Sequence, residues 1–112
     1  MTPRQKISFR SSNVPKKFKI HLTRNAQNDL EHIFFYIASD NIENAKKFIL
    51  ELEEKIYSLD TSPERCPLIP ENIFFGTNYR HLIHKKYRAI YKIINNSVYI
   101  LRIVHGAKLL EL

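Results

Sequence analysis

Basic and aromatic residues recur in the last third of the sequence, in a combination that suits chemistry on a phosphate ester. The candidates are Arg80, Arg88, Tyr91 and His105. Arginine presents a planar fork of donors that binds phosphate or carboxylate bidentately, and histidine titrates near neutral pH. Attack of a 2′-hydroxyl on an RNA phosphate needs a proton acceptor, a proton donor and surrounding cations. These four residues can fill those roles in a metal-independent endoribonuclease.

The same residues have structural interpretations, and the sequence leaves both open. Arg80 and Arg88 can flank an acidic patch of the chain itself or receive the carboxylates of a partner protein. Tyr91 lies in an apolar run that suits a core position, and His105 near the end of a strand suits a structural histidine. Strand register decides which side chains converge, and the sequence does not fix the register.

No metal or cofactor site is expected. His81 and His84 are three residues apart in a predicted strand and therefore point to opposite faces, and no zinc-binding spacing occurs. Only two glycines are present, which excludes a Gly-rich phosphate loop. Cys66 is the single cysteine, in a Pro-rich stretch without an activating partner, so no intrachain disulfide can form.

Length and composition favour a single globular domain in the cytoplasm. The chain has 112 residues, of which 44% are hydrophobic and 26% are charged. No apolar run approaches the roughly 20 residues of a membrane span, and the basic N-terminus lacks the apolar stretch of a secretory signal. A single thiol fits a reducing compartment.

Charge is distributed unevenly along the chain, whose formal net charge is +7. Residues 1–24 hold seven basic and no acidic groups, residues 25–60 three basic and eight acidic, and residues 61–112 eight basic and three acidic. Basic flanks around an acidic middle indicate an anionic partner, which can be nucleic acid, the ribosome or an acidic protein. The alternative is that the basic N-terminus only keeps a small domain in solution.

Two amphipathic helices are predicted over residues 25–38 and 43–59. Their apolar residues recur with a helical period and define one face on each helix. These residues are Ala26, Leu30, Ile33, Phe34 and Ile37 in the first helix and Ala45, Phe48, Ile49, Leu52, Ile56 and Leu59 in the second. Asp40 and Glu43 have the spacing of a capping box at the start of the second helix. A short polar break between the two predicts an antiparallel helical hairpin.

Strands are predicted on both sides of this hairpin. Residues 18–22 alternate apolar and polar side chains, and residues 79–84, 88–94 and 98–105 form three β-rich runs joined by short polar connections. The order is β-α-α-β-β-β, which predicts a two-layer α+β domain with the helical hairpin packed on an antiparallel sheet. We assign this domain to residues 17–112 and interpret residues 1–16 as a basic N-terminal arm outside it.

From about residue 18 to residue 109 the chain resembles the ParE/RelE superfamily of bacterial toxins, and the ParE branch in particular. Three ordered stretches carry the resemblance, and together they span about four-fifths of the chain. The first is Leu22-Thr23, Ala26, Asp29-Leu30, Ile33 and Tyr36-Ile37; the second is Ala45, Phe48, Leu52, Ile56, Leu59 and Pro63; the third is Gly76, Arg80, residues 87–91 and residues 98–108. The last run resembles the family's closing strand and its Leu-Arg…His-Gly-Ala-Arg ending, with Lys108 in the place of the final Arg.

The resemblance implies the toxin of a type II toxin–antitoxin module of the plasmid-stabilisation kind, held by a cognate antitoxin in a hetero-oligomer. The ParE branch poisons DNA gyrase and has no recognised catalytic residues, so gyrase is the implied target. The RelE branch instead cleaves mRNA on the ribosome, which is the alternative function and would give Arg80, Arg88, Tyr91 and His105 catalytic roles. Arg80, Arg102 and Lys108 are the expected partner-binding residues. The arm over residues 1–16 precedes the usual family start and can be a nucleic-acid arm, a partner-binding strand or a translation-start artefact.

Overall fold

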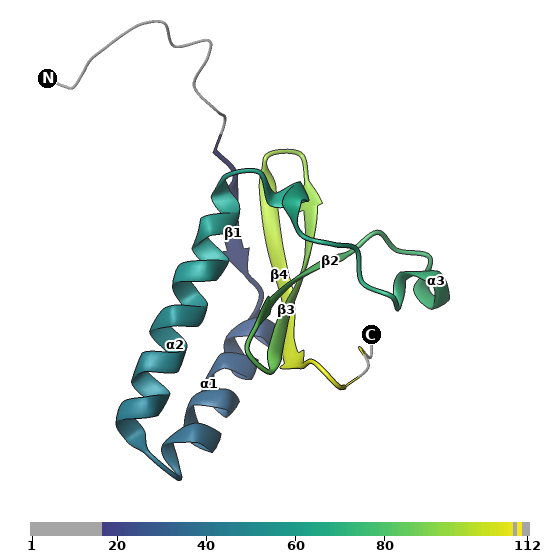
Figure 1. The fold of residues 1–112 in the computed structure, drawn as a ribbon. Coiled ribbons are helices and arrows are strands. Elements are labelled where there is room, and N and C mark those ends of the chain that lie inside the picture. Colours follow the sequence, from purple (N-terminus) through teal and green to yellow (C-terminus); the bar gives the residue numbers. More distant parts are fainter. Residues whose placement is uncertain (1–16, 109, 111–112) are drawn as a thin grey trace, which may run out of the picture.

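A computed structural model describes residues 17–108 and 110 (Figure 1). Strand β1 (Lys19–Leu22) leads into the helices α1 (Arg24–Ala38) and α2 (Ile42–Tyr57). Two short 3-10 turns (Ser58–Asp60 and Pro63–Arg65) and the short helix α3 (Asn72–Phe75) follow, and the chain ends with β2 (Arg80–His84), β3 (Tyr87–Ile94) and β4 (Ser97–His105). The predicted order β-α-α-β-β-β of the strands and long helices is confirmed. The basic arm predicted over residues 1–16 lies outside the described residues.

The four strands form one sheet in the order β1-β4-β3-β2. Strands β2, β3 and β4 make the predicted antiparallel meander, but β1 pairs with β4 in parallel, so the expectation of a wholly antiparallel sheet was wrong. Thr23 alone separates β1 from α1, and the helix continues in the direction of the strand (Figure 1). Strand β3 runs antiparallel to β2, and β4 runs antiparallel to β3, so that β4 has the same direction as β1. No described helix is long and apolar enough to span a membrane.

Side-chain caps set where both long helices begin. The Thr23 hydroxyl accepts a hydrogen bond from the Ala26 amide at 3.2 Å and donates to the Ile100 carbonyl at 2.8 Å, which ties the start of α1 to β4. Asn41 caps α2 by accepting from the Asn44 amide at 2.9 Å. The capping box expected at Asp40 is therefore wrong by one residue, because the amide oxygen of Asn41 meets the first-turn N–H groups instead.

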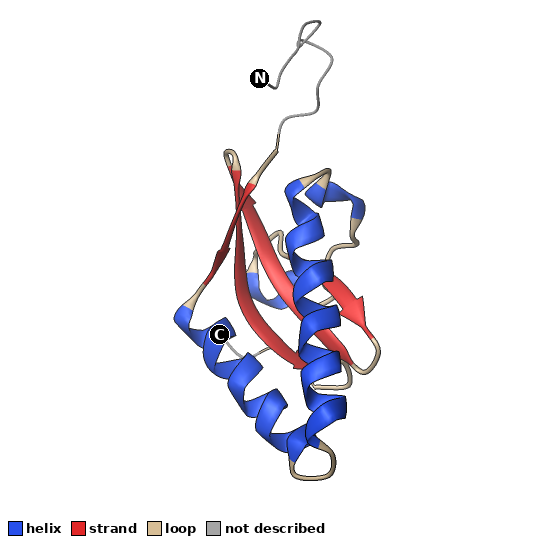
Figure 2. Cartoon of the chain, turned by 90° about the vertical axis from the view of Figure 1, so that its left-hand side faces the viewer, coloured by secondary structure: helices blue, strands red, loops and turns tan. Residues whose placement is uncertain are grey.

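The main core lies between the helical hairpin and one face of the sheet. Figures 1 and 2 show α1 and α2 paired over this face. The core contains most of the predicted apolar residues of both helices together with alternate strand residues: Ala26, Leu30, Ile33, Phe48, Leu52, Ile56, Leu59, Cys66, Ala89, Tyr91, Val98, Ile100 and Ile103. The predicted stripe residues Phe34, Ile37 and Ile49 are only partly buried. Leu52, Ile56 and Tyr91 have no exposed surface.

On the opposite face of the sheet, described residues form a second cluster at one end. There the loop before β2 and the segment after β4 pack this small cluster, formed by Ile69, Ile90, Val104 and Leu110 with Tyr79 against it. In Figure 1, α3 lies on this side, away from α1 and α2. Asn72 holds the loop together, since its side chain accepts from the Tyr79 amide at 3.0 Å and donates to the Tyr79 carbonyl at 2.9 Å.

A β-bulge in β4 breaks the alternation that the sequence predicts for this strand. Ile90 pairs with Arg102 while Tyr91 pairs with Ile100, which leaves Leu101 without a counterpart. An extra residue on one strand moves the following side chains to the other face. As a result Ile100 and Ile103 both face the helices, whereas strict alternation places them on opposite faces.

The buried hydroxyl of Tyr91 gives a first testable prediction. It donates a hydrogen bond to the Pro63 carbonyl at 2.6 Å. Tyr91→Phe removes the donor and leaves a buried carbonyl unpaired, so we expect the free energy of unfolding to fall by about 1–2 kcal/mol. Urea denaturation measures the change, and Tyr57→Phe is the matched control because Tyr57 is half exposed. Equal stability of the two variants would contradict the prediction.

Candidate functional site

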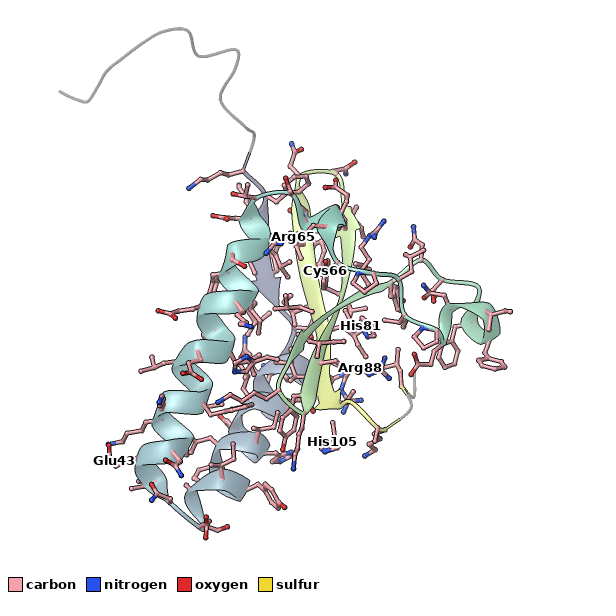
Figure 3. All side chains as sticks on the ribbon, in the orientation of Figure 1. Glu43, Arg65, Cys66, His81, Arg88 and His105 are labelled. Carbon is pink, nitrogen blue, oxygen red and sulfur yellow. The ribbon has the colours of Figure 1, made fainter. Side chains whose placement is uncertain are left out.

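A cleft of about 320 Å³ opens beside the turn between β2 and β3, next to the end of β4 and the loop before α3. Its wall combines basic and aromatic side chains: Lys85, Lys86, Lys108, His81, His105, Arg88 and Tyr87. Lys85, Lys86, His105 and Lys108 are exposed. Figure 3 places His81, Arg88 and His105 along this end of the sheet. The cleft is therefore lined largely by basic and aromatic side chains.

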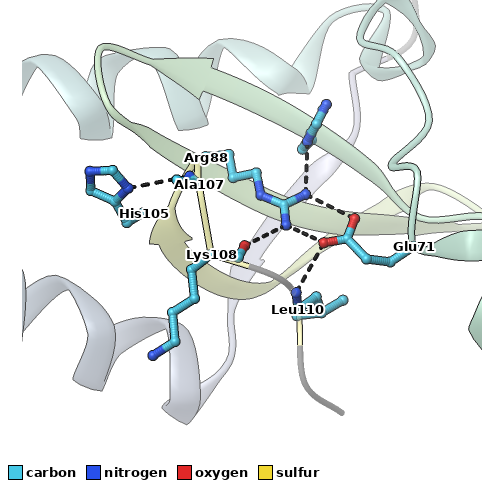
Figure 4. Close-up of polar contacts among 7 residues, drawn as sticks. Glu71, Arg88, His105, Ala107, Lys108 and Leu110 are labelled. Atoms are coloured by element: carbon cyan, nitrogen blue, oxygen red, sulfur yellow. Dashed lines mark hydrogen bonds and ion pairs between the residues drawn. The ribbon is translucent and has the colours of Figure 1, made fainter.

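The positive charge of Arg88 is not available in this cleft, because the side chain is buried and paired with a carboxylate. Its guanidinium donates to both carboxylate oxygens of Glu71, with the Nη1 contact at 3.1 Å and a shorter one from Nη2 (Figure 4). The side chains of Arg88 and Glu71 are 5% and 4% exposed. We call this pair the Glu71–Arg88 clasp. The carboxylate of Glu71 offsets the positive charge of Arg88, and a bidentate pair of this kind is among the strongest hydrogen-bonded contacts in proteins.

The clasp also holds the segment after β4 against the sheet. The Leu110 amide donates to the Glu71 carboxylate at 3.0 Å, and Arg88 Nη2 donates to the Lys108 carbonyl at 2.9 Å (Figure 4). The hydrogen bond from Arg88 lowers the pKa of Glu71 from 4.5 to about 2, against the opposing effect of burial. Glu71 is therefore ionised at every physiological pH, and the segment after β4 is held by an ion pair.

His81 completes this network as a neutral acceptor. Its Nδ1 lies 3.2 Å from Arg88 Nη1, and a guanidinium can only donate. Burial and then the charge of Arg88 lower the pKa of His81. The ring is thus held uncharged with its Nδ1 lone pair already used.

His105 is exposed, but its geometry does not suit a general base. Its Nδ1 accepts a hydrogen bond from the Ala107 amide at 3.2 Å, and its ring meets Tyr87 edge-on at 5.6 Å between centroids. A neutral imidazole whose Nδ1 accepts carries its proton on Nε2. The nitrogen that faces solvent is then a donor, so His105 is placed to donate a hydrogen bond to an anionic group.

The other predicted site residues lie elsewhere. Arg80 Nη1 donates to the Cys66 carbonyl at 2.6 Å, and Tyr91 is in the main core. Arg102 binds the Asp29 carboxylate, with contacts at 2.8 and 3.1 Å. The structure therefore brings together Arg88, His105 and Lys108 and separates them from Arg80, Tyr91 and Arg102. Among the described residues no group of three or more His, Cys, Asp or Glu side chains could hold a metal ion.

Sequence reasoning missed several residues of this cleft. Lys85 and Lys86 belong to one of the short polar connections that the sequence predicts, and the turn of a hairpin displays its side chains to solvent. No local sequence pattern identifies Glu71 as the partner of Arg88. The two residues are 17 positions apart, and the path of the loop that brings them together depends on tertiary packing.

The depressed pKa of Glu71 predicts acid-sensitive stability. A group whose pKa is lower in the folded state stabilises the fold above its unfolded pKa and loses that contribution as pH falls through the folded value. Between pH 4.5 and about 2 we expect a loss of about 3 kcal/mol in the free energy of unfolding. Denaturant titrations across this range measure the loss, and Glu71→Gln should lack this part of the pH dependence. An unchanged profile in Glu71→Gln would refute the assignment.

A helical hairpin on one face of a four-stranded sheet, with a basic cleft at its end, defines a small two-layer α+β domain. Among sequence families, the one described as ParE toxin of type II toxin-antitoxin system, parDE, matches residues 20–110. The chain therefore belongs to the ParE toxin family and is a ParE-type toxin of a type II toxin–antitoxin system. A comparison with curated protein sequences found no match.

Solved structures share this fold. The structure described as a chromosomal ParDE toxin–antitoxin system from P. aeruginosa superposes with a TM-score of 0.64 at 21% sequence identity, covering 80% of this chain and 97% of that chain. The toxin–antitoxin complex RelBE2 from Mycobacterium tuberculosis gives a TM-score of 0.59 at 22% identity, covering 82% and 94%. The fold is thus common to ParE and RelE proteins and does not by itself distinguish their targets.

Proposed function

We propose that this toxin inhibits DNA gyrase by binding to it, without a catalytic step of its own. The Glu71–Arg88 clasp is the observation that carries the proposal. A ribonuclease needs an available cation at the phosphate together with an acid–base pair. Here the Arg88 charge is neutralised by Glu71, Tyr91 is buried, and His105 presents a donor.

Exposed cations of the cleft provide the contact for such a target. Lys86 and Lys108 are exposed, and Lys85, which lies 3.4 Å from Glu51, is 60% exposed. Together with the donor nitrogen of His105 they suit an acidic surface on a partner protein, because flexible ammonium groups contribute mainly attraction and orientation. Of the expected partner-binding residues, Lys108 retains this role in the proposal.

A cognate antitoxin is the second partner we propose. Both solved relatives are described as toxin–antitoxin systems or complexes, which supports a hetero-oligomer here. The outer surface of the helical hairpin leaves large apolar side chains exposed, including Phe35 at 66%, Tyr36 at 73% and Leu50 at 63%. Apolar area of this kind marks a protein–protein contact, and an amphipathic antitoxin segment would cover it.

Ribosome-dependent cleavage of mRNA is the alternative function. The observation that favours it is the gathering of His105, Lys86 and Lys108 around one cleft. It predicts that His105→Ala or Arg80→Ala abolishes RNA cleavage while the fold and antitoxin binding persist. Cleavage that survives in both variants would rule out this assignment of the residues.

Incorporation of labelled precursors after controlled induction in bacteria tests the proposal. Thymidine and methionine are followed in parallel over the first minutes. Gyrase inhibition predicts that DNA synthesis fails first and that cells filament. If protein synthesis stops first, the result would support the ribonuclease alternative instead. Unimpaired growth would show that the chain has neither activity.

A further inference from the structure

Three side chains form a row across the sheet at the end opposite the cleft. His21 on β1, Tyr99 on β4 and Lys92 on β3 are in register on neighbouring strands. The rings of His21 and Tyr99 stack, with centroids 4.8 Å apart and planes at 16°, and Lys92 Nζ lies 6.0 Å from the Tyr99 centroid. His21 Nε2 is 3.3 Å from the Ser97 hydroxyl, a contact that orients the ring.

This part of the sheet face is open. The loop before β2 and the segment after β4 cover the face around Ile90 and Val104. By contrast His21 is exposed, and Tyr99 and Lys92 are partly exposed. Because β1 is an edge strand, the ring of His21 is the last of the row. Lys19, two residues earlier on the same face of β1, is also exposed.

Charge distinguishes this face from the helical layer. The four described strands contain no Asp or Glu, and on this face they carry Lys19 and Lys92, whereas Arg88 and Arg102 are paired with Glu71 and Asp29. Helices α1 and α2 together hold six carboxylates and four basic side chains. Asp60, whose backbone carbonyl accepts from the Phe18 amide just before β1, is paired through its carboxylate with Lys17 Nζ at 3.8 Å. Just before that point, residues 1–16 of the sequence add Arg4, Lys6, Arg10 and Lys16 and no acidic group.

We propose that the row His21–Tyr99–Lys92 binds single-stranded nucleic acid. A base extends the stack on the outer face of His21, and Lys19 and Lys92 contact phosphates at separate points along the same strand. Stacking on a ring and attraction by lysine together are the means by which proteins bind single strands without reading their sequence. A preformed stack of planar rings favours a base over an acidic peptide, because a peptide carboxylate would interact only with the lysine charges and not with the rings.

This site is separate from the cleft and from the proposed inhibition of gyrase. The row lies near Ser97, where β4 begins, whereas the cleft lies near His105, where β4 ends. Its loss should therefore leave the cleft intact. The result is a toxin that can hold a single strand at one end of its sheet and a protein at the other.

Fluorescence anisotropy with the purified full chain and a labelled 20-nucleotide oligo(dT) tests the site. We expect micromolar binding at low salt that weakens as salt rises. His21→Ala and Lys92→Gln should each raise the Kd at least fivefold, and Lys92→Gln should reduce the slope of log K against log salt by about 0.7. Lys46→Gln on α2 is the matched control, because Lys46 is exposed and pairs with Glu43 in the helical layer.

Each remaining outcome decides against the proposal. Absence of binding at low salt would overturn it, as would an equal loss in the control Lys46→Gln. Equal affinity for a duplex of the same length would show that base stacking does not contribute to binding. Equal affinity for poly-glutamate would show that the surface binds acidic proteins instead.

Discussion

Replacing Glu71 by alanine is expected to lower the free energy of unfolding by about 3–5 kcal/mol, the cost of leaving a buried charge without its partner. The Arg88 guanidinium is 5% exposed, and its Nε has no hydrogen-bond partner among the described residues. The Leu110 amide also loses its acceptor. In a chain of this size the change should reduce Tm by more than about 10 °C in thermal unfolding followed by circular dichroism.

Glu64→Ala is the control for the clasp, since Glu64 is an exposed carboxylate in the same loop region. We expect it to change stability by less than about 0.5 kcal/mol. A second variant, Glu71→Met with Arg88→Met, removes both charges and should recover much of the lost stability, because two apolar side chains need no counter-ion. If Glu71→Ala were as stable as Glu64→Ala, the clasp would be a surface pair of little consequence.

Reversal of charge in the cleft should have the second large effect. In Lys86→Glu with Lys108→Glu, two exposed cations face an acidic target as anions, and we expect the affinity for purified gyrase to fall at least tenfold. Both side chains are exposed, so the variant should remain folded. Titration of gyrase against the immobilised toxin measures the Kd.

Lys46→Glu with Lys47→Glu provides the matched charge change on α2, where both side chains are also exposed. We expect this control to bind gyrase as the unaltered toxin does. A Kd that rises equally in both double variants would mean that net charge, and not the cleft, governs the interaction.

The fold was largely predictable because its elements are amphipathic with regular periods. The apolar stripes from Ala26 to Ile33 and from Ala45 to Ile56 were found in the helices and are buried against the sheet. The direction of β1 was not predictable, since it depends on α1 continuing after Thr23 without a reversal. Nor was the bulge at Leu101, because strand alternation in the sequence gives no sign of an inserted residue.

The candidate site was predictable in composition and not in arrangement. Arginines, histidines and lysines of the last third do gather at the sheet, but which of them face solvent depends on their counter-ions. Arg88 is neutralised by Glu71 and Arg102 is held by Asp29, and both carboxylates come from distant parts of the chain. Long-range pairs of this kind are set by tertiary packing, and no local pattern reports them.

Supercoiling of relaxed plasmid by purified gyrase, with increasing amounts of this toxin, tests the central proposal most directly. We predict inhibition that saturates with toxin concentration, is relieved by adding the cognate antitoxin, and is weakened but not abolished in His105→Ala, which loses one donor of the cleft. In a parallel reaction with translating ribosomes, the mRNA should remain intact. Undiminished supercoiling together with cleaved mRNA would contradict the account.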